Sequence, residues 1–515
     1  MKSKNNISIK RILCQCCLPM LFFALNMQQA NAQTEYIHMG TSKDVLNGVT
    51  VMWNGQGTAD SIKWGYTPAY EKGQFLASNK AAVTFTGNWF YYNFGNGITP
   101  SATIYYEIKD SKTATWGDPQ KYHTATAIPS DTASTDFSFA ATGDSRDATS
   151  EFTKVANSMY AKNPDFVLFA GDMTHHGNVA SEWTTWFNSA DSLVYNKIMF
   201  TCMGNHDAEA PVTYLNMFNL PANGDGSDYN FYSYTHGNTL FIVLNFEYGD
   251  VAPNNPADWA AQTTWMTNLL SNIDTNKIKW KVVMWHEPYY TVGSSVGDMS
   301  YAGWWPVFDK YGVDLVINCH DHDYQRFKPI NQTVSQSAPV SKYGSWPGEG
   351  RCEIICGGAG APLDKQSVFN SPLVQTFQSV NSFVLFNETG CQNGFTKMHI
   401  TTYNDAGTTI LDSVTITKVC SAPTGIPATS AKANSINVVP NPATNEITLQ
   451  YTSAVQGNAV IKIMDVNGKT VKAYNTVKDK TYLEYKCNVS DLAKGFYILS
   501  VSVGSQQDQI KFIIN

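Results

Sequence analysis

Several polar side chains stand in the sequence directly after apolar runs that have the length of buried strands. They are carboxylates, an amide and imidazoles, and in chain order they are Asp144, Asp172, His175, Asn205, His206, His286, His320 and His322. Imidazole together with carboxylate suits borderline metals such as Zn, Fe and Mn. The supply is enough for two metal ions if one carboxylate bridges them. Two such ions can clamp both oxygens of an in-line phosphoryl displacement and generate a hydroxide nucleophile.

The elements that must position these groups alternate between strands and helices. Between residues 134 and 417, apolar strands alternate with longer amphipathic stretches. The polar strand ends read FSFAATGD, FVLFAGD, KIMFTCMGNHD, TLFIVLNFE, KVVMWHEP and VDLVINCHDHD. This pattern predicts an α/β layered domain whose functional loops lie at the carboxyl ends of its strands.

Two further regions show a different, short-strand pattern. Residues 34–128 contain short alternating runs such as VTVMW and ATIYYEIKD, separated by turn residues, which predicts an antiparallel β-sandwich. Residues 418–435 are rich in Ser, Ala, Pro and Thr and are typical of a linker. Residues 436–515 return to short strands and predict a second compact β-sandwich.

The N-terminus has the three parts of a secretory signal. Residues 1–32 combine a basic start, an apolar stretch and the small-x-small sequence Ala30-Asn31-Ala32, so we expect cleavage after Ala32. Beyond this signal no segment approaches the roughly 20 apolar residues of a transmembrane helix, so we expect an exported protein without a membrane span. The net charge of -7, with no block of Lys and Arg, argues against a nucleic-acid-binding module.

Seven of the ten cysteines follow the expected signal, and their scattered positions exclude a small disulfide scaffold. Cys352 and Cys356 are close enough in sequence to bind zinc, but they lack a second close pair. Buried thiols or a disulfide are the alternatives for these two residues.

The polar strand ends form five ordered blocks, GDSRD, GDMTH, GNHD, VMWH and HDH, between residues 137 and 417. In this order they resemble the calcineurin-like metallophosphoesterases and, within them, the purple acid phosphatases. The resemblance implies a β-sandwich flanked by helices and a binuclear metal centre. It also implies that residues 34–128 are a fibronectin type III-like domain.

The resemblance assigns roles residue by residue. Asp144 and His322 would bind the first metal, Asp172 would bridge, and Asn205, His286 and His320 would bind the second. His206 would lie near the scissile phosphate, where it would stabilise that group or protonate the leaving oxygen. Tyr324 and Arg326 match the family's continuation of the last block, where they would brace the loop.

Two positions depart from the purple enzymes, which have Gly and a metal-binding Tyr where this sequence has Arg146 and His175. Without the tyrosinate we expect an enzyme that is not purple. His175 would complete the first metal site instead. Arg146 is a candidate substrate contact, since guanidinium forks onto phosphate oxygens; a salt bridge to Asp147 is the alternative. His176 lines the cleft or is part of a polar turn.

The C-terminal residues 436–515 resemble the sorting domain of type IX secretion, which implies a secreted or cell-surface protein and the type IX machinery as a partner. We therefore expect a secreted binuclear-metal phosphatase that hydrolyses small phosphate monoesters. A phosphodiesterase or nucleotidase of the same family, or an inactive surface-binding protein, are the alternatives. Aromatic residues in 289–305 would stack a base or sugar, or simply pack.

Overall fold

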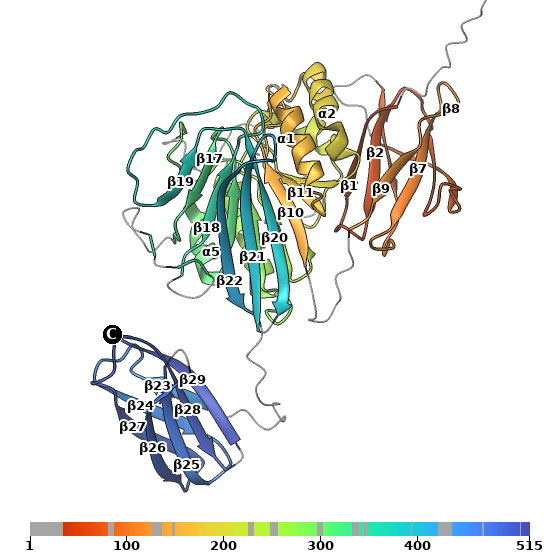
Figure 1. Ribbon diagram of the computed structural model, residues 1–515. Helices are drawn as coiled ribbons and strands as arrows, with labels where there is room; N and C mark the ends of the chain where they lie inside the picture. Colours follow the sequence, from red (N-terminus) through yellow and green to blue (C-terminus); the bar gives the residue numbers. More distant parts are fainter. Residues whose placement is uncertain are drawn as a thin grey trace, which may run out of the picture. The chain divides into compact units, whose positions relative to one another are not determined.

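The computed structural model describes residues 34–80, 87–125, 136–146, 150–224, 231–247, 256–295, 302–331, 339–340, 342–344, 349–392, 394–420, 435–465, 468–504 and 506–515. The expected signal peptide, Asp147 and residues 421–434 of the linker expected at 418–435 lie outside these residues. At the ends of that expected linker, β22 runs to Val419 and β23 begins at Ser435. The chain divides into two compact units, Met1–Pro423 and Thr424–Asn515 (Figure 1).

The first unit is built on a ten-stranded sheet with the order β22-β21-β20-β10-β11-β12-β1-β2-β6-β5. Its strands are β1 (Thr34–Thr41), β2 (Val49–Gly55), β5 (Ser78–Lys80), β6 (Asn88–Asn93), β10 (Phe137–Thr142), β11 (Phe166–Phe169), β12 (Ile198–Thr201), β20 (Ser382–Gln392), β21 (Phe395–Asn404) and β22 (Ile410–Val419). Strands β10, β11 and β12 are parallel. All residues of β11 and β12 are buried, as expected for parallel strands that are covered on both faces.

A seven-stranded sheet packs against this first sheet and has the order β13-β14-β15-β16-β18-β17-β19. Its strands are β13 (Tyr232–His236), β14 (Thr239–Val243), β15 (Trp280–Met284), β16 (Leu315–Asn318), β17 (Tyr324–Phe327), β18 (Cys352–Cys356) and β19 (Val374–Gln378). Aromatic rings fill the space between the sheets: Phe241 of β14 meets Phe139 of β10 edge-on at 5.1 Å and Phe166 of β11 at 5.3 Å. This core holds the two sheets in a fixed register.

Helices cover the outer faces of both sheets. They are α1 (Ser150–Ala161), α2 (Ala180–Val194), α3 (Pro211–Met217), α4 (Pro256–Ser271) and α5 (Trp305–Tyr311), with 3₁₀ turns η1 (Asp207–Glu209) and η2 (Ala302–Trp304). Phe152, Val155 and Met159 of α1 recur at helical spacing and are buried together with Trp186 of α2 against the first sheet. Trp305 and Phe308 of α5 are buried against the second sheet. The expected layered α/β fold, a β-sandwich flanked by helices, is confirmed.

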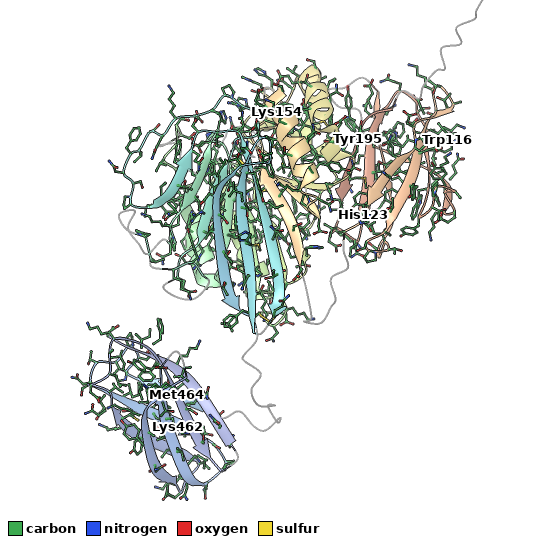
Figure 2. The ribbon with its side chains drawn as sticks, viewed as in Figure 1. Trp116, His123, Lys154, Tyr195, Lys462 and Met464 are labelled. Atoms are coloured by element: carbon green, nitrogen blue, oxygen red, sulfur yellow. A yellow bond between two sulfur atoms is a disulfide. The ribbon has the colours of Figure 1, made fainter. Side chains whose placement is uncertain are left out.

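The N-terminal strands form a sandwich whose second sheet has the order β4-β3-β7-β8, with β9 pairing β7. These strands are β3 (Ser61–Gly65), β4 (Gly73–Leu76), β7 (Thr103–Asp110), β8 (Thr115–Trp116) and β9 (Gln120–His123). The all-β architecture fits a fibronectin type III-like region. Its other sheet continues into the α/β region, because β1 pairs in parallel with β12 through Met39 and Ile198. Tyr195, which follows α2, packs against the clusters on both faces of this shared sheet (Figure 2).

The second unit is a β-sandwich with sheet orders β23-β24-β27 and β26-β25-β28-β29. Its strands are β23 (Ser435–Val439), β24 (Glu446–Thr452), β25 (Gly457–Met464), β26 (Thr470–Lys478), β27 (Tyr482–Asn488), β28 (Gly495–Val503) and β29 (Gln506–Ile514). Side chains alternate along β25, where exposed Lys462 lies between buried Ile461 and Ile463 (Figure 2). The alternation explains why this region was predictable as a sandwich.

Among the described residues, one disulfide joins Cys391 of β20 to Cys420, just after β22. Cys352 and Cys356 are free thiols, both fully buried on β18, so the buried-thiol alternative holds for this pair. In the described part of the chain we find no helix with the length and apolar character needed to cross a membrane.

Candidate metal centre

The candidate ligands come together because they follow parallel strands whose carboxyl ends meet at one edge of the sandwich. Asp144 follows β10, Asp172 follows β11 and Asn205 follows β12, all in the first sheet. The histidines come from the second sheet: His286 follows β15, whereas His320 and His322 follow β16. One sheet therefore supplies carboxylates and an amide, and the other supplies imidazoles.

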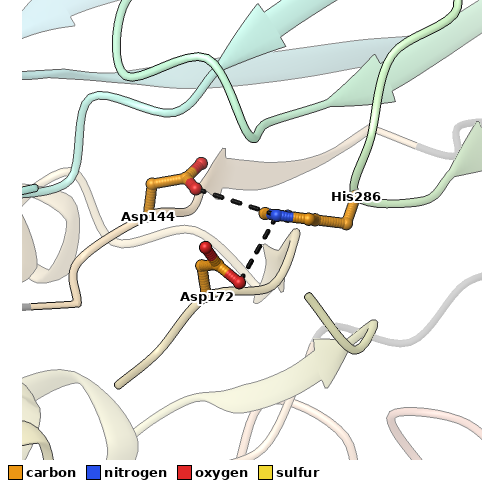
Figure 3. A group of neighbouring side chains, drawn as sticks. All are labelled: Asp144, Asp172 and His286. Atoms are coloured by element: carbon orange, nitrogen blue, oxygen red, sulfur yellow. Dashed lines mark ion pairs between the residues drawn. The ribbon is translucent and has the colours of Figure 1, made fainter. Parts of the chain in front are cut away.

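Asp144, Asp172 and His286 form the centre of the cluster (Figure 3). One ligand atom from each lies within 4.8 Å of the others, and all three side chains are buried. His286 Nε2 lies 3.4 Å from Asp172 Oδ1 and 3.9 Å from Asp144 Oδ1. Two carboxylates and one imidazole held this close, away from water, match the donor set of a transition-metal site.

Asn205 and His320 extend the cluster on one side. Asn205 Oδ1 is 3.2 Å from His286 Nε2 and 3.2 Å from His320 Nδ1. On the other side, His322 Nε2 is 3.7 Å from Asp144 Oδ1. The six residues that the resemblance names as shared ligands are thus brought together around the two carboxylates.

Backbone geometry at this edge is unusual. Nine non-glycine residues in the described chain have positive φ, and three of them are Asp144 (φ 57), Asp172 (φ 54) and His320 (φ 70). Such conformations cost of order 1–3 kcal/mol each and persist where the surroundings hold them. The neighbouring glycines permit the close approach, since a Cβ on Gly204 would lie 2.2 Å from Asp172 Oδ1.

Backbone carbonyls fix the orientation of two histidines. His286 Nδ1 donates to the Ala170 carbonyl at 2.7 Å, and His322 Nδ1 donates to the Pro362 carbonyl at 2.7 Å. Each ring therefore turns Nε2 toward the carboxylates with a lone pair available. This is the second-layer arrangement that orients metal-binding imidazoles.

Asp207, the last residue of the GNHD block, braces the carboxylate loop, a role that the sequence did not predict. Its carboxylate accepts from the backbone N–H groups of Asp172 at 2.8 Å, Met173 at 3.1 Å and Gly204 at 3.0 Å. The side chain is completely buried, and this burial, with the nearby charge of Asp172, raises its pKa to about 7. Its place within a ligand block was the sequence signal for this role.

The electrostatics of the two carboxylates favour a bound cation. Burial and the neighbouring charge of Asp172 raise the pKa of Asp144 well above its usual range. For Asp172, burial is outweighed by His286 and His206, which lower its pKa. Asp144 Oδ1 is buried and has no hydrogen-bond partner among the described residues. A metal ion would supply the positive charge that this atom lacks, so the residues fit such a group.

Arg146 and His206 face each other across the cleft. Arg146 NH1 lies 2.5 Å from His206 Nε2, and Arg146 NH2 lies 2.9 Å from His322 Nε2. His206 Nδ1 donates to the His175 carbonyl at 2.6 Å, so its Nε2 accepts from the guanidinium. Burial and the charge of Arg146 lower the pKa of His206, although Asp172 opposes this. Both side chains are therefore positioned to reach a bound anion.

The adjacent histidines of the GDMTHHG stretch stack on each other with ring centroids 4.4 Å apart, but their other contacts differ. The His175 ring is half-buried and meets the His206 ring edge-on at 5.1 Å. His176 is exposed, and its ring Nδ1 and backbone N–H contact the Glu182 carboxylate of α2 at 3.0 and 2.7 Å. Neither residue is among those that line the pocket described below, so the polar-turn interpretation fits His176. The metal-binding role of His175 stays a prediction.

Tyr324 and Arg326 brace the loop that carries the paired histidines. Arg326 forks onto Asp412 of β22 at 2.6 and 3.0 Å, and the Tyr324 hydroxyl donates to the same carboxylate at 2.9 Å. Since Arg326 belongs to the second sheet and Asp412 to the first, this contact ties the two sheets together. It agrees with the expected bracing role.

A cavity of about 190 Å³ opens over the cluster. It is lined by Arg146, Asp172, Asn205, His206, Ser294, Ser295, His320, His322 and Asp364. The sequence did not indicate Ser294, Ser295 or Asp364 as site residues, because no motif marks them. Tyr290 instead packs edge-on against Trp305 at 4.9 Å, so the described aromatic residues of 289–305 favour packing over stacking on a substrate.

Two family models match the chain. Residues 137–324 match the calcineurin-like phosphoesterase family, and residues 437–515 match the secretion system C-terminal sorting domain. The first match contains all five of the blocks described above. The second coincides with the C-terminal sandwich.

Relatives with curated names are similar at low identity. Purple acid phosphatase 18 of Arabidopsis thaliana is 22% identical over 60% of this chain and 69% of its own length. Purple acid phosphatase 15 of the same plant is 23% identical over 50% of this chain, which spans only 53% of that relative. The solved purple acid phosphatase from yellow lupin (Lupinus luteus) has the same fold, with a TM-score of 0.61, 16% identity and 78% of both chains covered. Residues 137–324 therefore match a calcineurin-like phosphoesterase domain, which together with the purple acid phosphatase relatives supports a phosphoric ester hydrolase, and residues 437–515 match a secretion-system sorting domain.

Proposed function

We propose that the protein is a secreted binuclear-metal phosphatase that hydrolyses small phosphate monoesters. The observation that carries this proposal is the convergence of two buried carboxylates, an amide and three imidazoles at one edge of the sandwich. Two metal ions bound there would supply an activated water and neutralise phosphoryl oxygens. Fe, Zn and Mn all suit this mixture of ligands.

The chain's own residues divide the binding task. Asp172, whose Oδ1 lies 3.4 Å from His286 Nε2, would bridge the two ions. Asp144 and His322 would hold one ion, with His175 completing that site. Asn205, His286 and His320 would hold the other. The carbonyl contacts of His286 and His322 keep both rings from turning, which lowers the cost of assembling the site.

Arg146 and His206 would handle the substrate. A guanidinium can fork onto two phosphate oxygens, and Arg146 already lies at the cavity wall. His206 presents Nε2 to the same space and would stabilise the phosphate or return a proton to the leaving oxygen. The cavity's small volume and its lining of polar and charged residues favour a compact monoester over a nucleotide.

The sorting domain supports export to the cell surface or beyond, with the type IX secretion machinery as the partner that reads residues 437–515. The expected signal peptide would direct the first membrane crossing. A test is the location of the mature chain in cells with and without residues 437–515. Equal export of the truncated chain would contradict this role of the domain.

Metal content and turnover test the enzymatic proposal together. We expect the purified chain to hold close to two metal ions and to hydrolyse an aryl phosphate, with loss of turnover on chelation and recovery on adding Mn, Zn or Fe. A colourless protein is expected from the missing tyrosine. Absence of both bound metal and turnover under all three ions would rule out the phosphatase and favour a surface-binding protein.

A further inference from the structure

Two loops next to the histidines form part of the cavity wall. Ser294 and Ser295 follow β15 and its His286 loop, whereas Asp364 follows β18. The loops are joined to each other, because the Ser367 N–H donates to the Val292 carbonyl at 2.8 Å. This wall is therefore a single, connected feature of the site.

Asp321, which lies between the two candidate ligand histidines, holds the serine loop in place. Its buried carboxylate accepts from the Ser295 N–H at 2.9 Å and from the Thr291 hydroxyl. Gly293 allows this approach, since a Cβ there would lie 2.6 Å from Asp321 Cγ. The Gln325 amide oxygen accepts from the Val292 N–H at 2.9 Å. Ser294 and Ser295 are thus positioned by the same segment that carries His320 and His322.

Asp364 is fixed in a similar way on the other loop. Its Oδ2 accepts from the His322 N–H at 2.9 Å, and its own N–H donates to the His322 carbonyl at 3.0 Å. In the described chain, the Ser295 hydroxyl and Asp364 Oδ1 have no hydrogen-bond partner. The Ser294 hydroxyl donates to Asp321 Oδ1 at 3.4 Å and can still accept a hydrogen bond. Ser295 thus offers a hydroxyl donor, and Asp364 a carboxylate acceptor, to whatever occupies the cavity.

We propose that Ser294, Ser295 and Asp364 recognise hydroxyl groups on the alcohol part of the phosphate ester, so that the preferred substrates are phosphates of small polyhydroxy alcohols. The inference rests on the proposed phosphatase function and names its substrate class. Serine hydroxyls both donate and accept, and a carboxylate accepts, which together match neighbouring hydroxyls. A site built to bond a hydroxyl rejects an analogue that lacks it, because its own polar groups stay unpaired.

An ammonium-bearing alcohol would also suit a carboxylate, but the surrounding charge opposes it. Arg146 lines the same cavity, and the metal cluster would add further positive charge within it. Like charges in a partly desolvated site repel strongly. A neutral polyol avoids this repulsion and still satisfies the carboxylate.

Three substrates of similar size test the proposal on the metal-loaded full chain: glycerol 3-phosphate, n-propyl phosphate and O-phosphoethanolamine. We expect kcat/KM for glycerol 3-phosphate to exceed that for n-propyl phosphate by about tenfold or more, because about two hydrogen bonds are at stake. In Ser295→Ala and Asp364→Asn, this preference for glycerol 3-phosphate over n-propyl phosphate should fall about tenfold. Ser367→Ala is the matched control, since Ser367 lies on the Asp364 loop outside the cavity lining, and it should keep the full preference.

The outcomes separate this inference from the proposed function. Equal kcat/KM for glycerol and propyl phosphates, or a preference for O-phosphoethanolamine, would overturn the hydroxyl subsite while leaving the phosphatase intact. No turnover of any ester, including an aryl phosphate, would overturn the phosphatase itself. If a variant loses turnover of all esters, metal content and a circular dichroism melt identify misfolding, and Asp364→Glu then provides the second variant. The subsite would also be overturned if folded Ser295→Ala, Asp364→Asn and Asp364→Glu all kept the wild-type preference for glycerol 3-phosphate over n-propyl phosphate.

Discussion

The two sheets of the central sandwich contribute different chemistry to one cluster. The ten-stranded sheet supplies Asp144, Asp172 and Asn205, whose oxygens are hard donors, whereas the seven-stranded sheet supplies His286, His320 and His322. Among the six ligands that the resemblance shares with the family, neither sheet supplies both kinds of donor that a borderline metal prefers. The complete set of ligands is therefore held together only while the two sheets keep their relative positions.

Two kinds of contact hold those positions. Aromatic rings fill the interior, and charged pairs cross between the sheets through β22, where Asp412 meets Arg326 and Lys418 meets Asp314 at 2.8 Å. Because both pairs use β22, damage to this one strand should loosen the imidazole half relative to the carboxylate half. The following predictions test the carboxylate half, which is the set of ligands on the ten-stranded sheet, and the joint, which is the set of contacts between the two sheets.

The largest effect is expected in the carboxylate half. Asp172→Asn keeps the shape but removes the charge of the proposed bridge, so kcat/KM on an aryl phosphate should fall about 10⁴-fold, or about 5 kcal/mol of transition-state stabilisation. Steady-state kinetics with metal analysis measures this. Asp274→Asn, an exposed carboxylate on the same unit, is the control. If Asp172→Asn keeps the kinetics and metal content of the wild type, Asp172 is not a ligand of the metal centre.

The joint between the sheets should respond next. Asp412→Ala leaves the Arg326 guanidinium, only 8% exposed, without its carboxylate, so the free energy of unfolding should fall by about 3–5 kcal/mol. The change is measured by unfolding the chain with denaturant and following the fluorescence of the first unit. Lys154→Ala breaks an exposed pair on α1 (Figure 2) and should cost under about 1 kcal/mol. A loss in Asp412→Ala no larger than in this control would show that the brace is unimportant.

A histidine buried between the two sheets should make the stability of the fold depend on pH. His236 of β13 packs edge-on against Phe137 at 4.7 Å, and burial lowers its pKa to about 3. Below about pH 6.5 the unfolded chain binds a proton that the folded chain rejects, so stability should fall by about 2 kcal/mol from pH 6.5 to 5. His236→Phe should remove this contribution from the pH dependence of unfolding.

The matched control for this prediction is His123→Gln, since His123 is exposed on β9 (Figure 2). It should keep the wild-type slope of stability against pH. An identical slope in His236→Phe and wild type would contradict the assignment to His236.

The smallest effects separate two neighbouring imidazoles in the carboxylate half. His175→Ala should lower metal affinity at the first site about tenfold, a loss typical of removing a group that completes or orients a ligand set. His176→Ala removes a half-exposed contact with Glu182 and the stacking of its ring on His175, and it should change kcat/KM by less than about twofold. Metal titration of both variants measures the contrast. If both variants bind metal as the wild type does, His175 is not a metal ligand. The ten-stranded sheet then supplies only oxygen ligands, and the seven-stranded sheet supplies all the imidazole ligands.

Much of the layered fold could be predicted because its signals are local. Apolar runs such as FVLFA and KVVM predict buried strands, helical spacing predicts α1, and alternation predicts the C-terminal sandwich. The continuation of the first sheet through β1 and β12 was not predictable, since Met39 and Ile198 are distant in sequence and neither carries a pairing signal. The boundaries expected near 128 and 134 accordingly stay predictions.

For the site, the sequence by itself determined which side chains stand after which strands, and their order was enough to indicate a binuclear metal centre. Only the tertiary structure decided that Asp144, Asp172 and His320 adopt positive φ, that His176 turns to Glu182, and that Asp207 and Asp321 brace the loops. The same holds for Ser294, Ser295 and Asp364, which meet at the cavity from separate loops. The physical reason is that residue type and strand ends are local properties, whereas a shared cavity depends on how two sheets pack.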